Sequence, residues 1–308
     1  MSPSEKVVVE VEGHTLTLSN LSKVLYPEVG FTKGEVIDYY TRIASVMLPH
    51  VIDRPVTLKR YPDGVDGPFF FEKNVPRGAP LWLKTIKVSS VSTRRDSGIV
   101  EHPLLRTLPD LVWAANLASL EIHVPMWKAG RGDPPRPPDL MVFDLDPGPP
   151  ATIVECCKVA LLVEELLQTG GMTGYPKTSG SKGMQLYVKL KGRPTWDSVK
   201  DLAHSIAQRL EKEHPGQVVS RMAKDLRPGK VFIDWSQNVP SKTTIAPYSL
   251  RARPQPTAST PVTWDEVEEC SKREDPAMLS FTTPDVLKRV ENQGDLFAGL
   301  LKDPAPAR

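Results

Sequence analysis

Apolar and polar residues follow two periodicities along the chain, which predict short strands and amphipathic helices. Alternating or continuous apolar segments predict strands at residues 7–12, 14–18, 55–60, 69–73, 86–91, 121–124, 140–146, 184–190 and 230–235. Helical spacing with capping residues predicts helices at 33–47, 110–120, 152–168 and 196–213, and two more that begin at Thr263 and Thr283. Because strands and helices mix without strict alternation, we expect an α+β fold with mixed sheets rather than a doubly wound one.

The composition is that of an ordinary globular protein and excludes several classes. Hydrophobic residues make up 40% and charged residues 25% of the 308 positions. No apolar run approaches the roughly 20 residues that span a bilayer, and the N-terminus lacks the apolar core of a signal peptide. The three cysteines give neither a disulfide framework nor metal-site spacing. We therefore expect a cytoplasmic protein without a membrane partner.

Charge is distributed unevenly along the chain. Residues 177–253 carry 15 Lys and Arg against 6 Asp and Glu, whereas residues 254–308 carry 6 against 10. This asymmetry fits a basic face that meets phosphates, although a charge run is more often only a solvated surface. Neither a GxGxxG nor a GxxxxGK[ST] motif is present, so a dinucleotide fold or a P-loop is unsupported.

Aspartates at the ends of two predicted strands are the main chemical signal. Strand geometry places Asp144 and Asp146, in LMVFDLDPG, on one face. Two adjacent carboxylates repel each other unless a cation lies between them, and Mg²⁺ binds such groups. Asp234, in KVFIDW, ends a similar strand. If these strands are neighbours, three carboxylates converge as two-metal phosphoryl transfer requires. The alternatives are a helix-capping pair and, for Asp234, a structural salt bridge.

A loop of small residues precedes the strand at 184–190. Backbone N–H groups in TSGSKG can approach an anion, and Ser179, Ser181 and Lys182 add donors. The following strand directs Gln185, Tyr187 and Lys189 to one face. The alternative is a turn without a ligand.

Three ordered motifs resemble one known family. They are MVFDLDPG, KTSGSKGMQLYV, and KVFIDWSQN with the following SKTTIAPYSLRARP. Together they closely resemble the polymerase domain of bacterial ligase D, which belongs to the archaeo-eukaryotic primase superfamily and serves non-homologous end joining. The resemblance runs from NLSKVLYPEVGFTKGEVIDYY to the helix near Asp285.

The resemblance implies a fold and a domain organisation. The fold would be that of a primase-polymerase, with largely antiparallel sheets flanked by helices and an RRM-like catalytic sheet. Residues 1–308 would form a single domain. Its N-terminal lobe would span about residues 1–135, its catalytic lobe about 139–253 and a C-terminal helical segment about 262–300.

The resemblance also implies roles for individual residues. The metal ligands and catalytic residues would be Asp144, Asp146 and Asp234. The positions on the nucleotide side would be Lys59, Arg60, His123, Ser179, Lys182, Gln185 and Arg251. The positions on the DNA side would be Lys23 and Lys33 at the 5′-phosphate, Phe70 and Phe71 against the template base, and Lys224, Arg227 and Lys230 in a basic loop. The alternatives are a partly buried strand histidine, core phenylalanines and solvated lysines.

The implied activity is extension of a primer 3′-hydroxyl at DNA gaps or broken ends. It would use nucleoside triphosphates and two ions, Mn²⁺ or Mg²⁺, with a preference for ribonucleotides. The partners would be DNA with a 5′-phosphate, an end-binding protein and a separate ligase or a removed part of the chain. Two rivals remain: a non-catalytic end-binding module, and a haloacid-dehalogenase-type phosphatase, whose motif requires Thr or Val where Gly148 stands.

Position 185 departs from the family pattern. The family has histidine where this chain has Gln185. Hydrogen bonds of charged groups contribute about 1.5–3 kcal/mol and those of neutral groups about 0.5–1.5 kcal/mol. We therefore expect weaker catalysis at this site, not its loss.

Overall fold

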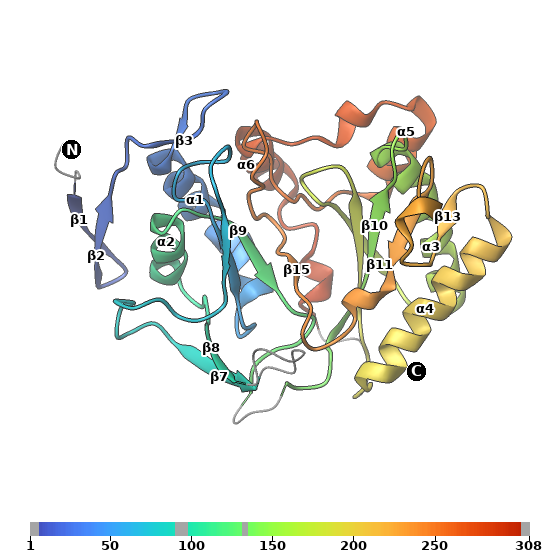
Figure 1. The fold of residues 1–308 in the computed structure, drawn as a ribbon, viewed down its shortest axis with the longest axis horizontal. Helices are drawn as coiled ribbons and strands as arrows, with labels where there is room; N and C mark the ends of the chain where they lie inside the picture. The colour runs from blue at the N-terminus through green and yellow to red at the C-terminus, as the bar shows by residue number, and fades with distance from the viewer. Residues whose placement is uncertain (1–5, 90–97, 131–134, 303–308) are drawn as a thin grey trace.

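The computed structural model describes residues 6–89, 98–130 and 135–302 (Figure 1). Its elements surround two β-sheets that lie side by side, with α1 and α2 beside one sheet and α3 and α4 beside the other. The helices are α1 (Lys33–Val51), α2 (Leu108–Asn116), α3 (Ile153–Thr169), α4 (Trp196–Glu213), α5 (Trp264–Arg273) and α6 (Thr283–Gln293).

The five-stranded sheet carries the aspartates. Its order is β11 (Gly174–Thr178), β12 (Met184–Lys189), β10 (Leu140–Pro147), β14 (Val231–Asp234) and β13 (Val218–Val219). Only the β13–β14 pair is parallel among these neighbours. One face of β10 presents Met141, Phe143 and Leu145 to the core formed with α3 and α4. Alternation along β10 therefore leaves Asp144 and Asp146 on the opposite face.

The four-stranded sheet lies beside α1 and α2. Its order is β15 (Thr244–Ile245), β9 (Ser119–Val124), β5 (Thr57–Arg60) and β6 (Phe70–Glu72), with all pairs antiparallel. Smaller antiparallel pairs are β1 (Lys6–Val11) with β2 (His14–Ser19), β3 (Val24–Tyr26) with β4 (Phe31–Thr32), and β7 (Thr85–Ser89) with β8 (Ile99–Pro103). The structure confirms the α+β prediction with largely antiparallel sheets.

Local signals set most helix boundaries. Thr32 and Glu35 form a capping box at α1, and Thr263 and Glu266 form another at α5, as the sequence predicts. The predicted helix at 110–120 was wrong at its C-terminal end, because α2 ends at Asn116 and Ser119 already lies in β9. Ala118 has a positive φ of 55°, which stops the helix and turns the chain into the strand.

Other differences concern strands and lobes. The predicted strand at 86–91 is β7 (Thr85–Ser89), and residues 90 and 91 lie outside the described residues. Tyr248 and Leu250, which we assigned to the catalytic lobe, pack in the core with α1 and β5. The reason is that β15 pairs with β9, so the chain returns to the four-stranded sheet before residue 253. Among the described residues, no helix is both long and apolar enough to cross a membrane.

Candidate active site

Strand register brings the three aspartates onto one surface. Asp144 lies opposite Asp234 on β14 and opposite Gln185 on β12, and Asp146 follows on the same face. All three aspartates are half-buried. The condition set by the sequence, that the two aspartate-bearing strands be neighbours, is therefore met.

The site concentrates negative charge. Burial, and then the neighbouring Asp146, raise the pKa of Asp144 to about 7, and Asp234 adds to the rise. Burial and the charge of Asp234 likewise raise the pKa of Asp146. Carboxylates in this situation are stabilised by a cation.

The side chains fit a divalent cation by chemistry but are not gathered around one point. Among the described residues no group of three or more His, Cys, Asp or Glu side chains is arranged to hold a metal ion. The Asp234 carboxylate instead accepts hydrogen bonds from the Ser236 backbone N–H at 3.0 Å and the Gln237 side chain at 2.8 Å. Hard oxygen donors on adjacent strands are the type of ligand that divalent cations such as Mg²⁺ or Mn²⁺ prefer.

A buried lysine that the sequence analysis missed stands behind Gln185. Lys177 is fully buried on β11, opposite Gln185, and its Nζ donates to Gln185 Oε1 at 2.7 Å and to Ser259 Oγ at 2.5 Å. Gln185 Nε2 donates to Asp144 Oδ1 at 3.0 Å. Burial lowers the pKa of Lys177 well below its usual value, although Asp144 opposes this shift. Lys177 thus fixes which end of the Gln185 amide faces Asp144.

The loop before β12 is held by its own hydrogen bonds. Ser179 Oγ accepts from the Gly183 N–H at 3.1 Å and the Ser181 N–H at 3.3 Å. Gly180 has a φ of +68°, and a Cβ there would lie 2.6 Å from the Ala258 carbonyl carbon, so glycine is required. These contacts fold the loop tightly and leave Lys182 exposed at its outer side.

Three cations face Asp146. Lys182, Arg227 and Arg251 each oppose the rise in its pKa, in that order. Gly148 allows the close approach of Arg227, because a Cβ at position 148 would overlap the Arg227 backbone carbonyl. The Arg227 guanidinium lies 3.8 Å from the centre of the Phe232 ring. Positive charge suited to phosphate therefore surrounds the acidic face.

Glu121, a second residue that the sequence analysis missed, organises the nucleotide-side cations. Its buried carboxylate lies 3.0 Å from His123 Nε2, 3.5 Å from Lys59 Nζ and 3.6 Å from Arg251. Burial alone would raise the pKa of Glu121, but the His123 hydrogen bond and the Arg251 charge lower it to about 2. Burial lowers the pKa of His123, although its hydrogen bond to Glu121 opposes this shift. The only sequence signal was alternation in SLEIHV, which cannot show that Glu121 is buried among cations.

Phenylalanines cover the outer side of these cations. Phe69, Phe70 and Phe71 are 52%, 44% and 56% exposed, so the alternative of core packing is wrong. The Lys59 ammonium lies 4.2 Å from the centre of the Phe69 ring and 5.6 Å from that of Phe71. Arg60 stacks on Phe70 at 5.1 Å and forms an ion pair with Glu72 at 2.8 Å. An exposed aromatic surface beside cations is suited to base stacking.

The lysines near the N-terminus of α1 differ from one another. Lys23 forms an exposed ion pair with Asp63 at 2.7 Å. Lys33 is 5% exposed and donates to the Ser19 carbonyl at 2.6 Å. Burial lowers the pKa of Lys33 to about 8, with further lowering by Arg60 and Lys23. The two lysines and Arg60 thus share one positive region, in which Lys23 is the accessible member.

Two other predicted DNA-side lysines lie on the surface of the basic loop. Lys224 is exposed in a short 3₁₀ helix, η1 (Lys224–Leu226). Lys230 donates to the Pro215 carbonyl at 2.7 Å. Arg227 of the same loop acts on the carboxyl of Asp146 and lowers its pKa.

The fold and the site together define a polymerase-type nucleotidyltransferase, with acidic residues on one face of a largely antiparallel sheet and cations near them. The chain belongs to the family described as LigD, primase-polymerase domain, whose model matches residues 32–297. This membership confirms the resemblance and removes the phosphatase alternative.

Individual relatives agree with this assignment. The multifunctional non-homologous end joining protein LigD of Mycolicibacterium smegmatis is 46% identical over 286 residues, which cover 93% of this chain and 36% of the relative. The bifunctional LigD of Bacillus subtilis is 30% identical over 290 residues, which cover 94% and 44%. The chain therefore spans less than half the length of these relatives.

A solved structure shows the same fold. The polymerase domain from Mycobacterium tuberculosis ligase D in complex with DNA is 44% identical, with a TM-score of 0.85. The match covers 94% of this chain and 99% of that one. The predicted primase-polymerase fold is therefore confirmed.

Proposed function

We propose that this chain extends a primer 3′-hydroxyl with nucleoside triphosphates at DNA gaps and broken ends, in non-homologous end joining. The observation that carries the proposal is the register of Asp144 opposite Asp234, with Asp146 on the same face and Lys182, Arg227 and Arg251 around it. The relatives named for end joining and the related domain in complex with DNA support it. Ribonucleotide preference, an end-binding partner and a separate ligase belong to the same proposal.

Asp144, Asp146 and Asp234 would hold two divalent cations, Mn²⁺ or Mg²⁺. When bound, such cations lower the pKa of the primer hydroxyl and neutralise charge on the triphosphate. Gln185 holds Asp144 in place through its amide, and Lys177 holds the amide. Each residue thus orients the group that carries the chemistry.

The nucleotide would lie between the acidic face and the Glu121 cluster. Lys182 and Arg251 would bind the triphosphate, with Ser179 keeping the loop folded beneath it. Lys59, Arg60 and His123 would line the base and sugar side, and Gln185 the floor of the site. Phe70 and Phe71 would stack on the template base, because both rings are exposed.

DNA on the far side of a gap would reach Lys23, with the buried Lys33 adding positive charge behind it. The basic loop with Lys224, Arg227 and Lys230 would meet the backbone. The test is extension of a labelled primer on gapped DNA with Mn²⁺ or Mg²⁺ and either ribonucleotides or deoxyribonucleotides. Extension that requires triphosphates and metal supports the proposal. DNA-end binding without extension under any metal would contradict it and favour the non-catalytic end-binding module.

Lys177→Met should lower the turnover rate of extension about tenfold, with DNA affinity unchanged. The reason is that Gln185 Oε1 loses its closer donor and keeps only the Tyr187 hydroxyl at 3.5 Å, and a lost hydrogen bond costs about 0.5–1.5 kcal/mol. Single-turnover kinetics measure the effect, and Lys158→Met is the control, because this half-buried lysine on α3 pairs with Glu274 and not with the site. Equal losses of rate, DNA affinity and thermal midpoint would mean that Lys177 only supports the core.

Lys23→Ala should remove the dependence of binding on the 5′-phosphate. Affinity for phosphorylated gapped DNA should fall about tenfold, to that for unphosphorylated DNA, since a charged hydrogen bond contributes about 1.5–3 kcal/mol. The Lys23–Asp63 ion pair is exposed, so the fold should lose less than about 1 kcal/mol. Fluorescence anisotropy with both DNAs measures this, and exposed Lys272→Ala is the control. A phosphate preference that persists in Lys23→Ala would refute the assignment.

A further inference from the structure

A second basic region lies at the other end of the strands that carry the active site. It is an open groove of about 910 Å³ at the start of β10 and the end of β12. We call it the distal groove and define it by its charged residues, Lys128, Arg136, Asp139, Lys189 and Arg193. The candidate active-site residues do not include any of these.

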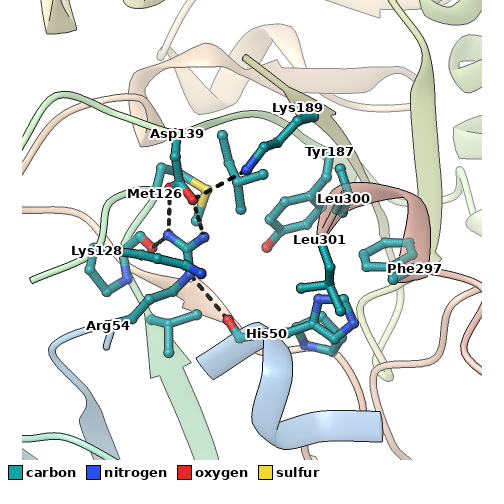
Figure 2. Close-up of a pocket in the computed structure, with 14 residues that line it drawn as sticks. His50, Arg54, Met126, Lys128, Asp139, Tyr187, Lys189, Phe297, Leu300 and Leu301 are labelled. Atoms are coloured by element: carbon teal, nitrogen blue, oxygen red, sulfur yellow. Dashed lines mark hydrogen bonds and ion pairs between the residues drawn. The ribbon is translucent and has the colours of Figure 1, made fainter. Parts of the chain in front are cut away.

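The groove carries an excess of positive charge. Its one carboxylate among the described lining residues, Asp139, already binds the buried Arg54 guanidinium through two hydrogen bonds of 2.8 and 2.7 Å. Lys189 is 3.9 Å from the same carboxylate (Figure 2). Lys128, Arg136 and Arg193 then add charge that Asp139 does not balance. A phosphate-bearing ligand would balance it.

Two cations of the distal groove, Lys128 and Arg136, lie in close contact with neighbouring groups. Burial, and then the neighbouring Arg54, lower the pKa of Lys128, and Lys189 adds to the lowering, while Asp139 and Asp53 oppose it. Arg136 lies flat against Gly130, where a Cβ would overlap its guanidinium. Like charges kept this close are stabilised when an anion binds between them.

The distal groove is separate from the acidic site. Between them, on the same sheet face, the side chains of Met126, Val142, Tyr187, Phe297 and Leu300 form a small buried cluster. Figure 2 shows Tyr187, Phe297 and Leu300 on one side and Arg54, Lys128 and Asp139 on the other. A ligand in the groove therefore does not touch the aspartates.

The position of the groove fits one strand of a DNA duplex. Lys189 follows Gln185 by four strand residues, a distance of about 13 Å at about 3.3 Å per residue. Backbone phosphates of one strand repeat every 3.4 Å or so along the duplex axis, so this distance corresponds to about four nucleotides. The backbone of a bound duplex could therefore reach both places.

The distal groove lies at the C-terminal end of β12, whereas the positive region formed by Lys23, Lys33 and Arg60 lies toward its N-terminal end. The loop before β12 contacts Arg253 through Ser181, and nearby Gln255 donates to Glu28 at 2.5 Å, close to Lys23 in sequence. The aspartates thus lie between the two basic regions. We propose that the distal groove binds backbone phosphates of the duplex upstream of the primer 3′-end, while Lys23 serves the downstream side. This inference rests on the proposed function, because it requires DNA at the acidic site.

The test is the salt dependence of DNA binding. The double variant Arg136→Ala/Arg193→Ala removes two exposed cations, and Lys128→Ala is a second, independent variant. The probe is gapped DNA with a 5′-phosphate and an upstream duplex of either about 4 or about 16 base pairs. In the parent the longer duplex should bind more tightly, and in the double variant this gain should disappear. The slope of log affinity against log salt should fall by about 1.8, since each phosphate contact contributes about 0.9.

A matched control separates groove contacts from net charge. Arg209→Ala/Lys212→Ala removes the same charge from exposed positions on α4 and should keep the length-dependent gain. The proposal would be overturned if both groove variants kept the affinity gain from the longer duplex and the salt slope of the parent. It would also be overturned if the control variant lost as much of either quantity as the groove variants. If the parent protein binds DNA with the expected length dependence but never extends a primer, the polymerase function is refuted, whereas DNA binding by the distal groove is supported.

Discussion

Asp144→Asn should reduce primer extension by at least about a thousandfold and leave DNA-end binding unchanged. Asparagine keeps the size of the side chain and its contact with Gln185 but removes the charge that would hold a cation between β10 and β14. Metal ligation contributes several kcal/mol to the transition state of phosphoryl transfer, and about 4 kcal/mol corresponds to a thousandfold in rate. Single-nucleotide extension under saturating triphosphate measures the effect.

The control for this variant is Asp201→Asn, an exposed aspartate on α4, which should extend at the parent rate. Because removing a charge from a crowded acidic face relieves repulsion, Asp144→Asn should fold at least as stably as the parent. Extension by Asp144→Asn within tenfold of the parent would show that the reaction does not depend on this face of the sheet.

Glu121→Gln should destabilise the fold by about 3 kcal/mol at pH 7. The substitution leaves Lys59 and Arg251 beside each other without their buried counter-charge, and breaking a buried ion pair from one side costs about 3–5 kcal/mol. Nucleotide affinity should fall as well, because Glu121 positions both cations. Urea unfolding measures the stability, and Glu268→Gln at an exposed ion pair should cost less than about 1 kcal/mol.

The same substitution predicts a pH dependence. The pKa of Glu121 is lowered from its usual 4.5 to about 2 in the folded protein. The carboxylate therefore stabilises the fold fully above pH 4.5, and this contribution is lost as the pH falls from 4.5 toward 2. The difference in unfolding free energy between parent and Glu121→Gln should shrink over that interval. A difference that stays constant from pH 7 to pH 3 would show that the carboxylate charge is not what stabilises the fold.

Local sequence patterns were sufficient for the helices, apart from the C-terminal end of α2, and for the strands that carry the aspartates. The capping boxes and the apolar stripe of α1 lie within a few residues of each other, so the sequence alone shows them. The alternation in β10 likewise separates the core-facing Phe143 from Asp144 within one segment. Both patterns depend on neighbouring residues and need no knowledge of distant segments.

Six strands were missed, β3, β4, β8, β11, β13 and β15, and two of them illustrate the lack of such patterns. β11 contains Gly174 and Pro176 and shows no clear alternation, so its sequence does not predict a strand. β15 has only two residues. Both form because a neighbouring strand provides backbone hydrogen bonds, which is a long-range effect.

The sequence by itself determined the fold class, the family resemblance and the residue types of the acidic site. Those properties follow from periodicity within single segments and from three ordered motifs. The tertiary structure alone decided that Asp234 lies opposite Asp144 in the strand register, that Lys177 supports Gln185 and that Glu121 lies beside His123, Lys59 and Arg251. The reason is that strand register and the burial of a charge depend on pairing between segments far apart in the chain.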